Sequence, residues 1–228
     1  MDLNIEQLIT HRLLLLSSME KDIGLFHGKM GLILFFAHYF KQTGLTVYND
    51  TADELMEELI EDIHEDLPVG LTSGLSGIGW GIEYLIQNGF LEGDSLEICR
   101  EIDKKIMERD PRRISDYSLD TGLEGLLHYV LMHIKSVIAQ HSKPPFDTVY
   151  LSDLYQAVTK VPHDAEVSEN FNRLSSKYAA WVENRTAFDY SLQLSSIIED
   201  SIGMAHNNLS VPPLGLKGLS GFLLNKIL

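Results

Sequence analysis

The stretch GLTSGLSGIGWG (residues 70–81) decides the fold of this 228-residue chain. Its first eight residues have the frame G-L-x-x-G-x-x-G, and a largely apolar segment follows at once. The same frame recurs as GLFHGKMG at residues 24–31. Two further copies, SLDTGLEG (residues 118–125) and LGLKGLSG (residues 214–221), keep the last two glycines. The recurrence indicates a chain built from repeated units.

The spacing of these copies is regular. The middle glycines are Gly28, Gly74, Gly122 and Gly218, at intervals of 46, 48 and 96 residues. Because the last interval is twice 48, the period predicts one degenerate copy near residue 170. A fixed period of this length is typical of repeat architectures, in which each unit is one supersecondary element.

Length and charge limit the possible function classes. The chain suits a single domain spanning residues 1–228. Its formal net charge of −15 argues against binding to nucleic acid or to an anionic membrane, because both require a basic face. An acidic surface favours a basic partner, such as a cationic peptide. No apolar run suits a signal sequence or a membrane span, so we expect a cytoplasmic protein.

Apolar periodicity predicts helices throughout. Amphipathic helices are expected at residues 4–19, 53–65, 94–107 and 191–204. More apolar helices are expected at 32–40, from the turn at 70–81 to about residue 88, and at 123–139, with shorter helices at 151–159 and 167–182. The many acidic residues of 53–65 are interpreted as a solvated face rather than a metal site, and Cys99 as a buried packing residue.

Two kinds of helix therefore alternate, and their alternation predicts the architecture. Helices that are apolar all round are buried, and amphipathic helices cover them. We predict an all-α fold, an α/α toroid of about five helical hairpins, with the inner helices beginning at the glycine turns. The glycines themselves have a purely structural interpretation, since they allow backbones to approach closely where a Cβ would clash.

The geometry of such a toroid also predicts a site. The N-termini of the inner helices would all lie at one end, each with about half a positive charge. Side chains just before the middle glycines would surround this mouth. Among them, His27 and Asp120 are candidate catalytic residues, and Ser73, Thr121 and Lys217 are candidate binding residues. A hydrogen-bonded structural role for His27 is the alternative.

The repeated frames, together with the aromatic-rich continuation WGIEYLIQNGF (residues 80–90), resemble the lanthionine synthetase C-like (LanC-like) family. The resemblance extends over residues 24–221. It implies an α-toroid, which in the family has seven hairpins. It also implies, for the cyclases of the family, a zinc ion that activates a cysteine thiolate for addition to a dehydrated Ser or Thr of a peptide. The family's zinc ligands lie just before the middle glycines, as a Trp-Cys pair and a Cys-His-Gly triplet.

This chain departs from that pattern. Residues 26–28 (Phe-His-Gly) keep the His-Gly but have Phe in place of Cys, and no other copy has a cysteine there. Zinc that activates a thiolate needs about three protein ligands. We therefore expect no metal and no other cofactor, and zinc-dependent cyclisation is not expected.

Three functional interpretations remain. The first is non-catalytic binding of a peptide or a peptide-modifying enzyme at the mouth of the toroid. The second is a zinc-free enzyme of the LanC-like class, with His27 and Asp120 as an acid–base pair acting on a peptide. The third is a glycosidase-like toroid, which needs two carboxylates such as Asp120 and Glu124.

The number of hairpins also raises the question of closure. About five hairpins cannot complete a ring of seven, so the first and last hairpins should each leave an apolar flank, at residues 13–16 and 222–227. Such flanks are normally covered by a partner or a second copy of the chain. We therefore expect a homo-oligomer or a dedicated partner, with closure of a smaller ring as the alternative.

Overall fold

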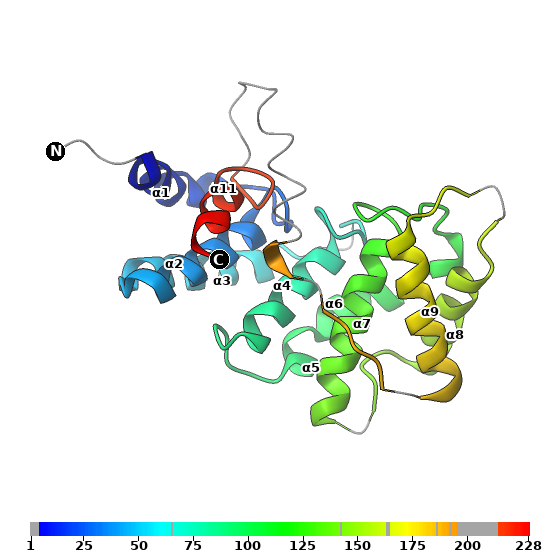
Figure 1. The fold of residues 1–228 in the computed structure, drawn as a ribbon. Helices are drawn as coiled ribbons and strands as arrows, with labels where there is room; N and C mark the ends of the chain where they lie inside the picture. The colour runs from blue at the N-terminus through cyan, green and yellow to red at the C-terminus, as the bar shows by residue number, and fades with distance from the viewer. Residues whose placement is uncertain are drawn as a thin grey trace. The chain divides into compact units, whose positions relative to one another are not determined.

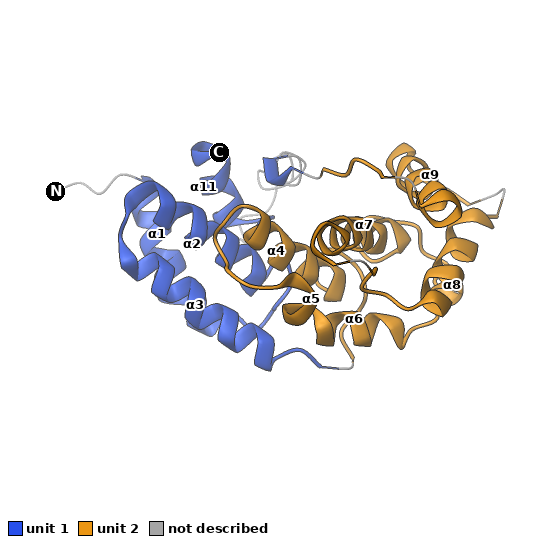
Figure 2. Ribbon diagram, turned by 90° about the horizontal axis from the view of Figure 1, so that it is seen from below, with its two compact units in different colours: residues 1–64, 192–228 blue, residues 65–191 orange. Residues whose placement is uncertain are grey.

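The computed structural model describes residues 5–64, 66–141, 143–162, 165–185, 187–191, 193–195 and 214–228. Within these ranges the regular structure is helical and no strand occurs (Figure 1), which confirms the predicted all-α class. The chain forms two compact units (Figure 2): unit 1 combines residues 1–64 and 192–228, and unit 2 comprises residues 65–191. In the described part of the chain no helix is long and apolar enough to cross a membrane.

Unit 1 pairs the beginning of the chain with its end. Its elements are α1 (Ile5–Leu16), the short 3₁₀ helix η1 (Ser17–Met19), α2 (Lys29–Thr43), α3 (Thr46–Glu61) and α11 (Leu219–Ile227). Helix α2 is buried along its whole first half, whereas α3 buries only a stripe that includes Leu55 and Leu59. Gly44 ends α2 in the left-handed conformation (φ 70°) and so turns the chain into α3. The two helices form the apolar–amphipathic hairpin expected from the sequence.

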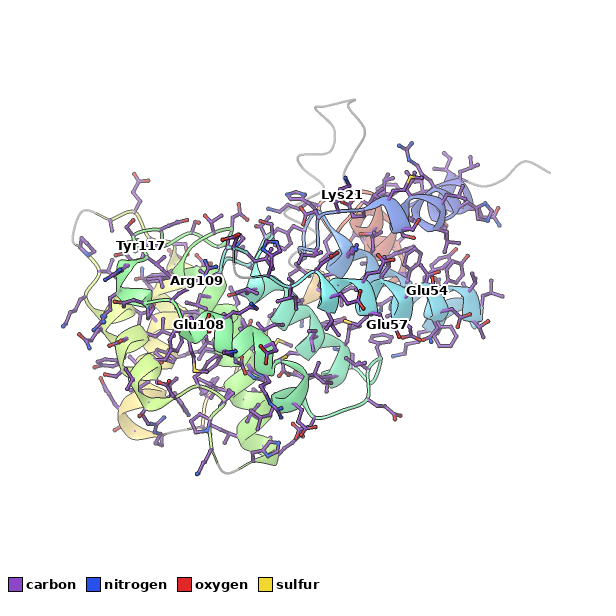
Figure 3. The ribbon with its side chains drawn as sticks, turned by 180° about the vertical axis from the view of Figure 1, so that it is seen from behind. Lys21, Glu54, Glu57, Glu108, Arg109 and Tyr117 are labelled. Carbon is purple, nitrogen blue, oxygen red and sulfur yellow. The ribbon has the colours of Figure 1, made fainter. Side chains whose placement is uncertain are left out.

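The acidic residues of α3 form a solvated face, as predicted. Glu54 and Glu57 lie on the exposed side of the helix (Figure 3). Glu58 and Asp62, at its end, each place a carboxylate oxygen 2.9 Å from the Nζ of Lys29, whose side chain is buried. These two carboxylates therefore compensate a buried cation.

The two ends of the chain cover each other. Helix α11 packs on α2 and contacts α1 (Figure 1), and both Leu13 and Leu224 are fully buried. Lys226 forms an ion pair of 2.8 Å with Glu6. The expectation that both hairpins lack a neighbour was therefore wrong where α11 meets the first hairpin, whereas Leu15 and Phe222 of the predicted apolar flanks stay exposed. Self-association stays a prediction.

Unit 2 contains the remaining described helices. They are α4 (Leu75–Gln87), α5 (Ser95–Ile98), α6 (Arg100–Met107), η2 (Pro111–Arg113), α7 (Leu123–Gln140), α8 (Thr148–Thr159) and α9 (Glu169–Asn184). Helix α7 packs against α4 on one side and α9 on the other, and α8 packs on α9 and η2. The helix predicted at 94–107 is interrupted at Cys99, and the one predicted at 191–204 lies largely outside the described residues.

The predicted degenerate copy near residue 170 is helix α9. Its N-cap is Ser168, whose Oγ accepts a hydrogen bond from the backbone N–H of Phe171 (2.8 Å). A capping serine thus begins this helix where the other copies have a glycine. From α1 to α9, helices that begin at a glycine turn, or at Ser168 in its place, alternate with helices that do not, as in the α/α toroid class predicted from the sequence.

Gly28, Gly74, Gly122 and Gly218 are the residues directly before α2, α4, α7 and α11, as predicted. The need for glycine is steric. A Cβ at Gly122 would lie 2.4 Å from the carbonyl oxygen of Asp116, the atom that accepts the backbone N–H of Leu123 (2.9 Å). The carbonyls of Asp22 and Pro68 block Gly28 and Gly74 in the same way. The middle glycine therefore lets the turn close on itself.

At Gly31 and Gly125, the last glycine of the frame avoids a carbonyl of its own turn and also allows contact with another turn. A Cβ at Gly125 would lie 2.9 Å from the backbone nitrogen of Leu71, in the preceding turn of unit 2. In unit 1, a Cβ at Gly31 would lie 2.7 Å from the backbone nitrogen of Leu216. The final turn of the chain therefore contacts the first turn in the way that the turn at 70–77 contacts the turn at 118–125.

Candidate functional site

A hollow of about 540 Å³ lies where the N-terminal ends of α7 and α9 meet in unit 2. Its walls come from the loop before α7, the first turn of α7 and the segment before α9. The described lining residues are Ser115, Asp116, Tyr117, Ser118, Leu119, Glu124, Ala165, Glu166 and Ser168. The hollow thus lies at the starts of two inner helices, the kind of position at which the sequence predicts a site.

Glu124 is the buried acid of this hollow. It stands in the first turn of α7 and is 5% exposed. The hydroxyl of Ser168 donates to one carboxylate oxygen and the amide of Asn170 to the other, both at 2.6 Å. The carboxylate is therefore held in one orientation before any ligand arrives.

The polar network continues inward from Glu124 to His128. The amide nitrogen of Asn170 also lies 3.1 Å from Nε2 of His128 and can only donate there, so Nδ1 carries the ring proton and donates to the Tyr190 hydroxyl (2.8 Å). Arg173 donates to the amide oxygen of Asn170 (2.5 Å), which fixes the orientation of that amide. Burial, with repulsion from Arg173, lowers the pKa of His128 to about 4, so the ring is neutral at pH 7.

The hollow is strongly negative. Three of its described lining residues, Asp116, Glu124 and Glu166, are carboxylates, and none is basic. A hydrogen bond from the Thr121 hydroxyl lowers the pKa of Asp116, which keeps this group ionised. Tyr117 (Figure 3) forms part of the wall. Three full negative charges outweigh the roughly half charge at each helix N-terminus, so the hollow suits a cationic ligand.

A second hollow of about 620 Å³ lies at the opposite ends of α7 and α9. Its lining includes the apolar side chains of Ile138, Trp181 and Phe188, and the cations Lys135 and Arg185. Arg185 lies 4.4 Å over the ring of Trp181. This surface therefore has the opposite charge from the hollow at the N-terminal ends.

Three of the five residues predicted for the site belong to unit 2. The Asp120 carboxylate accepts a hydrogen bond of 2.7 Å from the hydroxyl of Thr72. Thr121 donates to Asp116 and so supports the wall of the hollow without lining it. Ser73 is half-buried directly before Gly74.

The other two belong to unit 1, where they join the first and last turns. The His27 carbonyl accepts the backbone N–H of Gly215 (3.2 Å). Lys217 donates its backbone N–H to the Phe26 carbonyl (2.7 Å) and holds its Nζ 4.4 Å from the centre of the Phe26 ring. Because His27 and Asp120 lie in different units, their pairing stays a prediction.

The turns do not fit the zinc site that the resemblance implies. Phe26, at the position of a ligand cysteine, is 1% exposed and packs beneath Lys217. Thr72 and Asp120, at the equivalent positions of two other turns, hydrogen-bond to each other. His27 alone offers a nitrogen ligand there. We therefore derive no zinc-dependent step at these turns.

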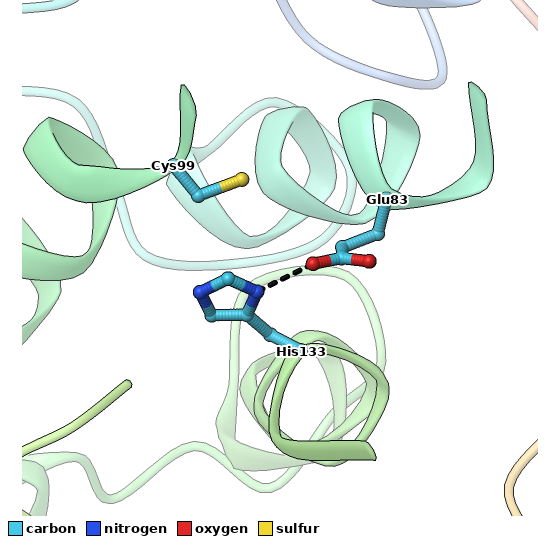
Figure 4. A group of neighbouring side chains, drawn as sticks. All are labelled: Glu83, Cys99 and His133. Atoms are coloured by element: carbon cyan, nitrogen blue, oxygen red, sulfur yellow. Dashed lines mark hydrogen bonds and ion pairs between the residues drawn. The ribbon is translucent and has the colours of Figure 1, made fainter. Parts of the chain in front are cut away.

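A second polar cluster lies inside unit 2, where α4, the junction of α5 and α6, and α7 meet (Figure 4). It contains Glu83, Cys99 and His133, with Asp103 and Tyr129 beside them, and all five side chains are buried. This cluster was not predicted, because Cys99 was interpreted as a packing residue and Glu83 and His133 lie away from the residues before the glycines. A glutamate and a histidine within two nearly all-apolar helices were the available signal.

Most of the hollow was likewise not predicted from the sequence. Glu124 was expected only as the second carboxylate of a glycosidase, and Asp116, His128 and Asn170 were not among the candidate residues. Asn170 could have been found, because the period places a repeat at residue 170 and the chain has polar residues there in place of glycines.

Comparison with known families gives one result. A family model described as lanthionine synthetase C-like protein matches residues 5–173 of the 228. The match begins in α1 and ends within α9, so it includes the hollow at the N-terminal ends of α7 and α9. No curated protein matches the chain.

Proposed function

Since the chain belongs to the lanthionine synthetase C-like family, we propose that it binds a peptide without modifying it and takes part in peptide modification in this way. The binding site that we propose is the hollow at the N-terminal ends of α7 and α9. The ligand group would be a basic one, such as a lysine side chain or a peptide N-terminus.

The observation that carries this proposal is the buried carboxylate of Glu124 at the edge of an acidic hollow. The hydrogen bonds from Ser168 and Asn170 orient it, so a ligand ammonium would meet an acceptor that needs no rearrangement. Asp116 and Glu166 add negative charge around it, and the net charge of −15 attracts cations from a distance.

Binding is favoured over zinc-dependent catalysis by the residues of the glycine turns. Those turns lack the cysteine ligands that the family's cyclases use, and Phe26 fills one of the positions with a buried ring. A zinc-free enzyme with His27 and Asp120 as acid–base pair remains the alternative.

Calorimetric titration with short peptides tests the proposal. We expect a lysine-containing peptide to bind and the same peptide with glutamine in place of lysine to bind at least about tenfold more weakly. The Glu124→Gln variant should lose about 10- to 100-fold in affinity, because hydrogen bonds to charged groups contribute about 1.5–3 kcal/mol. Glu54→Gln, on the exposed face of α3, is the matched control and should leave the affinity unchanged.

Mass spectrometry of the peptide after incubation separates binding from catalysis. An unchanged mass supports the binding function. A mass change that is lost in both His27→Ala and Asp120→Asn would establish the enzymatic alternative instead. Equal affinity of wild type and Glu124→Gln for the lysine peptide would contradict the proposed site.

A further inference from the structure

The buried cluster of unit 2 brings three different metal-ligand types together. Glu83 comes from α4, His133 from α7, and Cys99 from the junction of α5 and α6 (Figure 4). One potential ligand atom from each residue lies within 4.8 Å of the other two, and all three side chains are buried. These three residues are 16 and 34 positions apart in the chain, so only the packing of the helices joins them.

A second layer of hydrogen bonds supports these side chains. Nδ1 of His133 lies 2.5 Å from a carboxylate oxygen of Glu83, and its Nε2 lies 2.9 Å from Asp103. Tyr129 donates to the other Asp103 oxygen (2.6 Å). Gln87 donates to the second oxygen of Glu83 (3.2 Å). A histidine ligand in a metal site normally donates its other ring N–H to a carboxylate, as His133 can to Asp103.

The backbone around Cys99 also suits a ligand. The residue is at once the C-cap of α5 and the N-cap of α6, so the helix predicted at 94–107 breaks at the thiol. The side chain is fully buried, and it shares its surroundings with the carboxylates of Asp103 and Glu83.

We propose that Glu83, Cys99 and His133 bind one divalent transition-metal ion, with zinc as the metal that suits this set of oxygen, sulfur and nitrogen donors. Asp103 would orient His133 through Nε2, leaving Nδ1 for the metal. A water molecule would complete a tetrahedral site. The ion would link α4, the α5–α6 junction and α7.

The geometry and the charges are compatible with this site. Metal–ligand distances of about 2.0–2.3 Å place the ligand atoms of a tetrahedral site roughly 3.3–3.8 Å apart. The 2.5 Å contact between Nδ1 of His133 and Glu83 must therefore open by about 1 Å, whereas the wider separations, all within 4.8 Å, must close by no more than about 1.5 Å. Binding of M²⁺ would displace the thiol proton of Cys99 to solvent and free Nδ1 of His133 for the metal. Without metal, the same residues would form only a proton-bridged network between His133 and two carboxylates.

Cobalt binding tests the proposal with an unambiguous signal. Cys99 is the single cysteine of the chain, so any thiolate-to-cobalt charge-transfer absorption must come from it. The untagged full chain is stripped of metal and titrated with Co²⁺, both folded and during refolding, since the site is buried. We expect one Co²⁺ per chain with a charge-transfer band, and displacement of the cobalt by Zn²⁺.

Variants separate this site from adventitious binding. Cys99→Ser should abolish the charge-transfer band, and Asp103→Asn should weaken the affinity for Zn²⁺ about 10- to 100-fold. His128→Gln, a buried histidine of the same helix α7 outside the cluster, should retain one metal per chain, whereas His133→Gln should not. Circular dichroism verifies the fold of each variant. If His133→Gln does not fold, the result with Cys99→Ser decides the test. Absence of the band from the wild type, folded and refolded, would overturn the proposal.

Discussion

Replacement of Gly122 by alanine tests the steric account of the glycine turns. The added Cβ would lie 2.4 Å from the carbonyl oxygen of Asp116 and 2.6 Å from the backbone nitrogen of Ser118. Both are backbone atoms of the turn, so no flexible side chain can move aside. The backbone dihedral φ at Gly122 is −106°, which any residue can adopt, so a lack of space is the sole cause of the predicted effect.

The expected loss in the free energy of unfolding can be estimated from the contacts that the added Cβ disturbs. To reach an ordinary contact distance, the Asp116 carbonyl has to move by about 1 Å, which breaks its 2.9 Å hydrogen bond with the Leu123 N–H at a net cost of about 1 kcal/mol. Overpacking adds about 1–3 kcal/mol. Alanine also lowers the conformational entropy of the unfolded chain, which offsets about 0.4–1 kcal/mol of this loss. We expect Gly122→Ala to be destabilised by about 2–3 kcal/mol.

Thermal unfolding followed by circular dichroism measures this effect. For a chain of this size, about 2–3 kcal/mol corresponds to a fall in Tm of about 5–10 °C. The matched control is Gly44→Ala, since Gly44 has φ 70° but no atom within 4 Å of the added Cβ. The control should lose only the cost of a left-handed alanine, about 1 kcal/mol. A Gly122→Ala variant as stable as the wild type, or less affected than Gly44→Ala, would refute the steric reasoning.

Three further predictions concern buried side chains. Burial lowers the pKa of folded His128 from 6.5 to about 4, so on acidification the unfolded chain takes up the proton first. The free energy of unfolding should therefore fall by up to about 3 kcal/mol between pH 6.5 and pH 4. Urea titrations should show a weaker pH dependence for His128→Gln. Gly79→Ala should cost about 1–3 kcal/mol, because its Cβ would lie 2.4 Å from the buried ring of Tyr129, and an unchanged urea midpoint would contradict this. Burial raises the pKa of the Cys99 thiol well above its usual range, so alkylation should require unfolding, and rapid labelling of the folded chain would contradict the assigned burial.

The sequence predicted the helical framework because glycine spacing and apolar periodicity are local signals. Gly28, Gly74 and Gly122 each stand directly before a helix, and the period located α9 near residue 170 although its glycine is replaced by Ser168. The break at Cys99 was not predictable in this way, because the apolar pattern of residues 94–107 continues through it.

The proposed site lies at the starts of two helices, the kind of position at which the sequence predicts one, but its residues were not those expected. Asp120 and Thr121 were chosen because they precede a middle glycine, but the buried acid is Glu124, one turn further along α7. Glu124 contacts Ser168 and Asn170, which are 44 and 46 residues away in the chain. Such partners are set by the packing of α7 against α9, which periodicity within one helix does not reveal.

The central claim, that the hollow at the N-terminal ends of α7 and α9 binds a basic peptide, is tested most directly by mapping the bound peptide. A lysine-containing peptide is titrated into isotope-labelled protein, and backbone amide shifts are followed by NMR. We predict that the largest shifts cluster at residues 115–119 and 165–170 and vanish with the Glu124→Gln variant. Shifts centred on the apolar hollow around Trp181 and Phe188, or no saturable shifts with any basic peptide, would contradict the account.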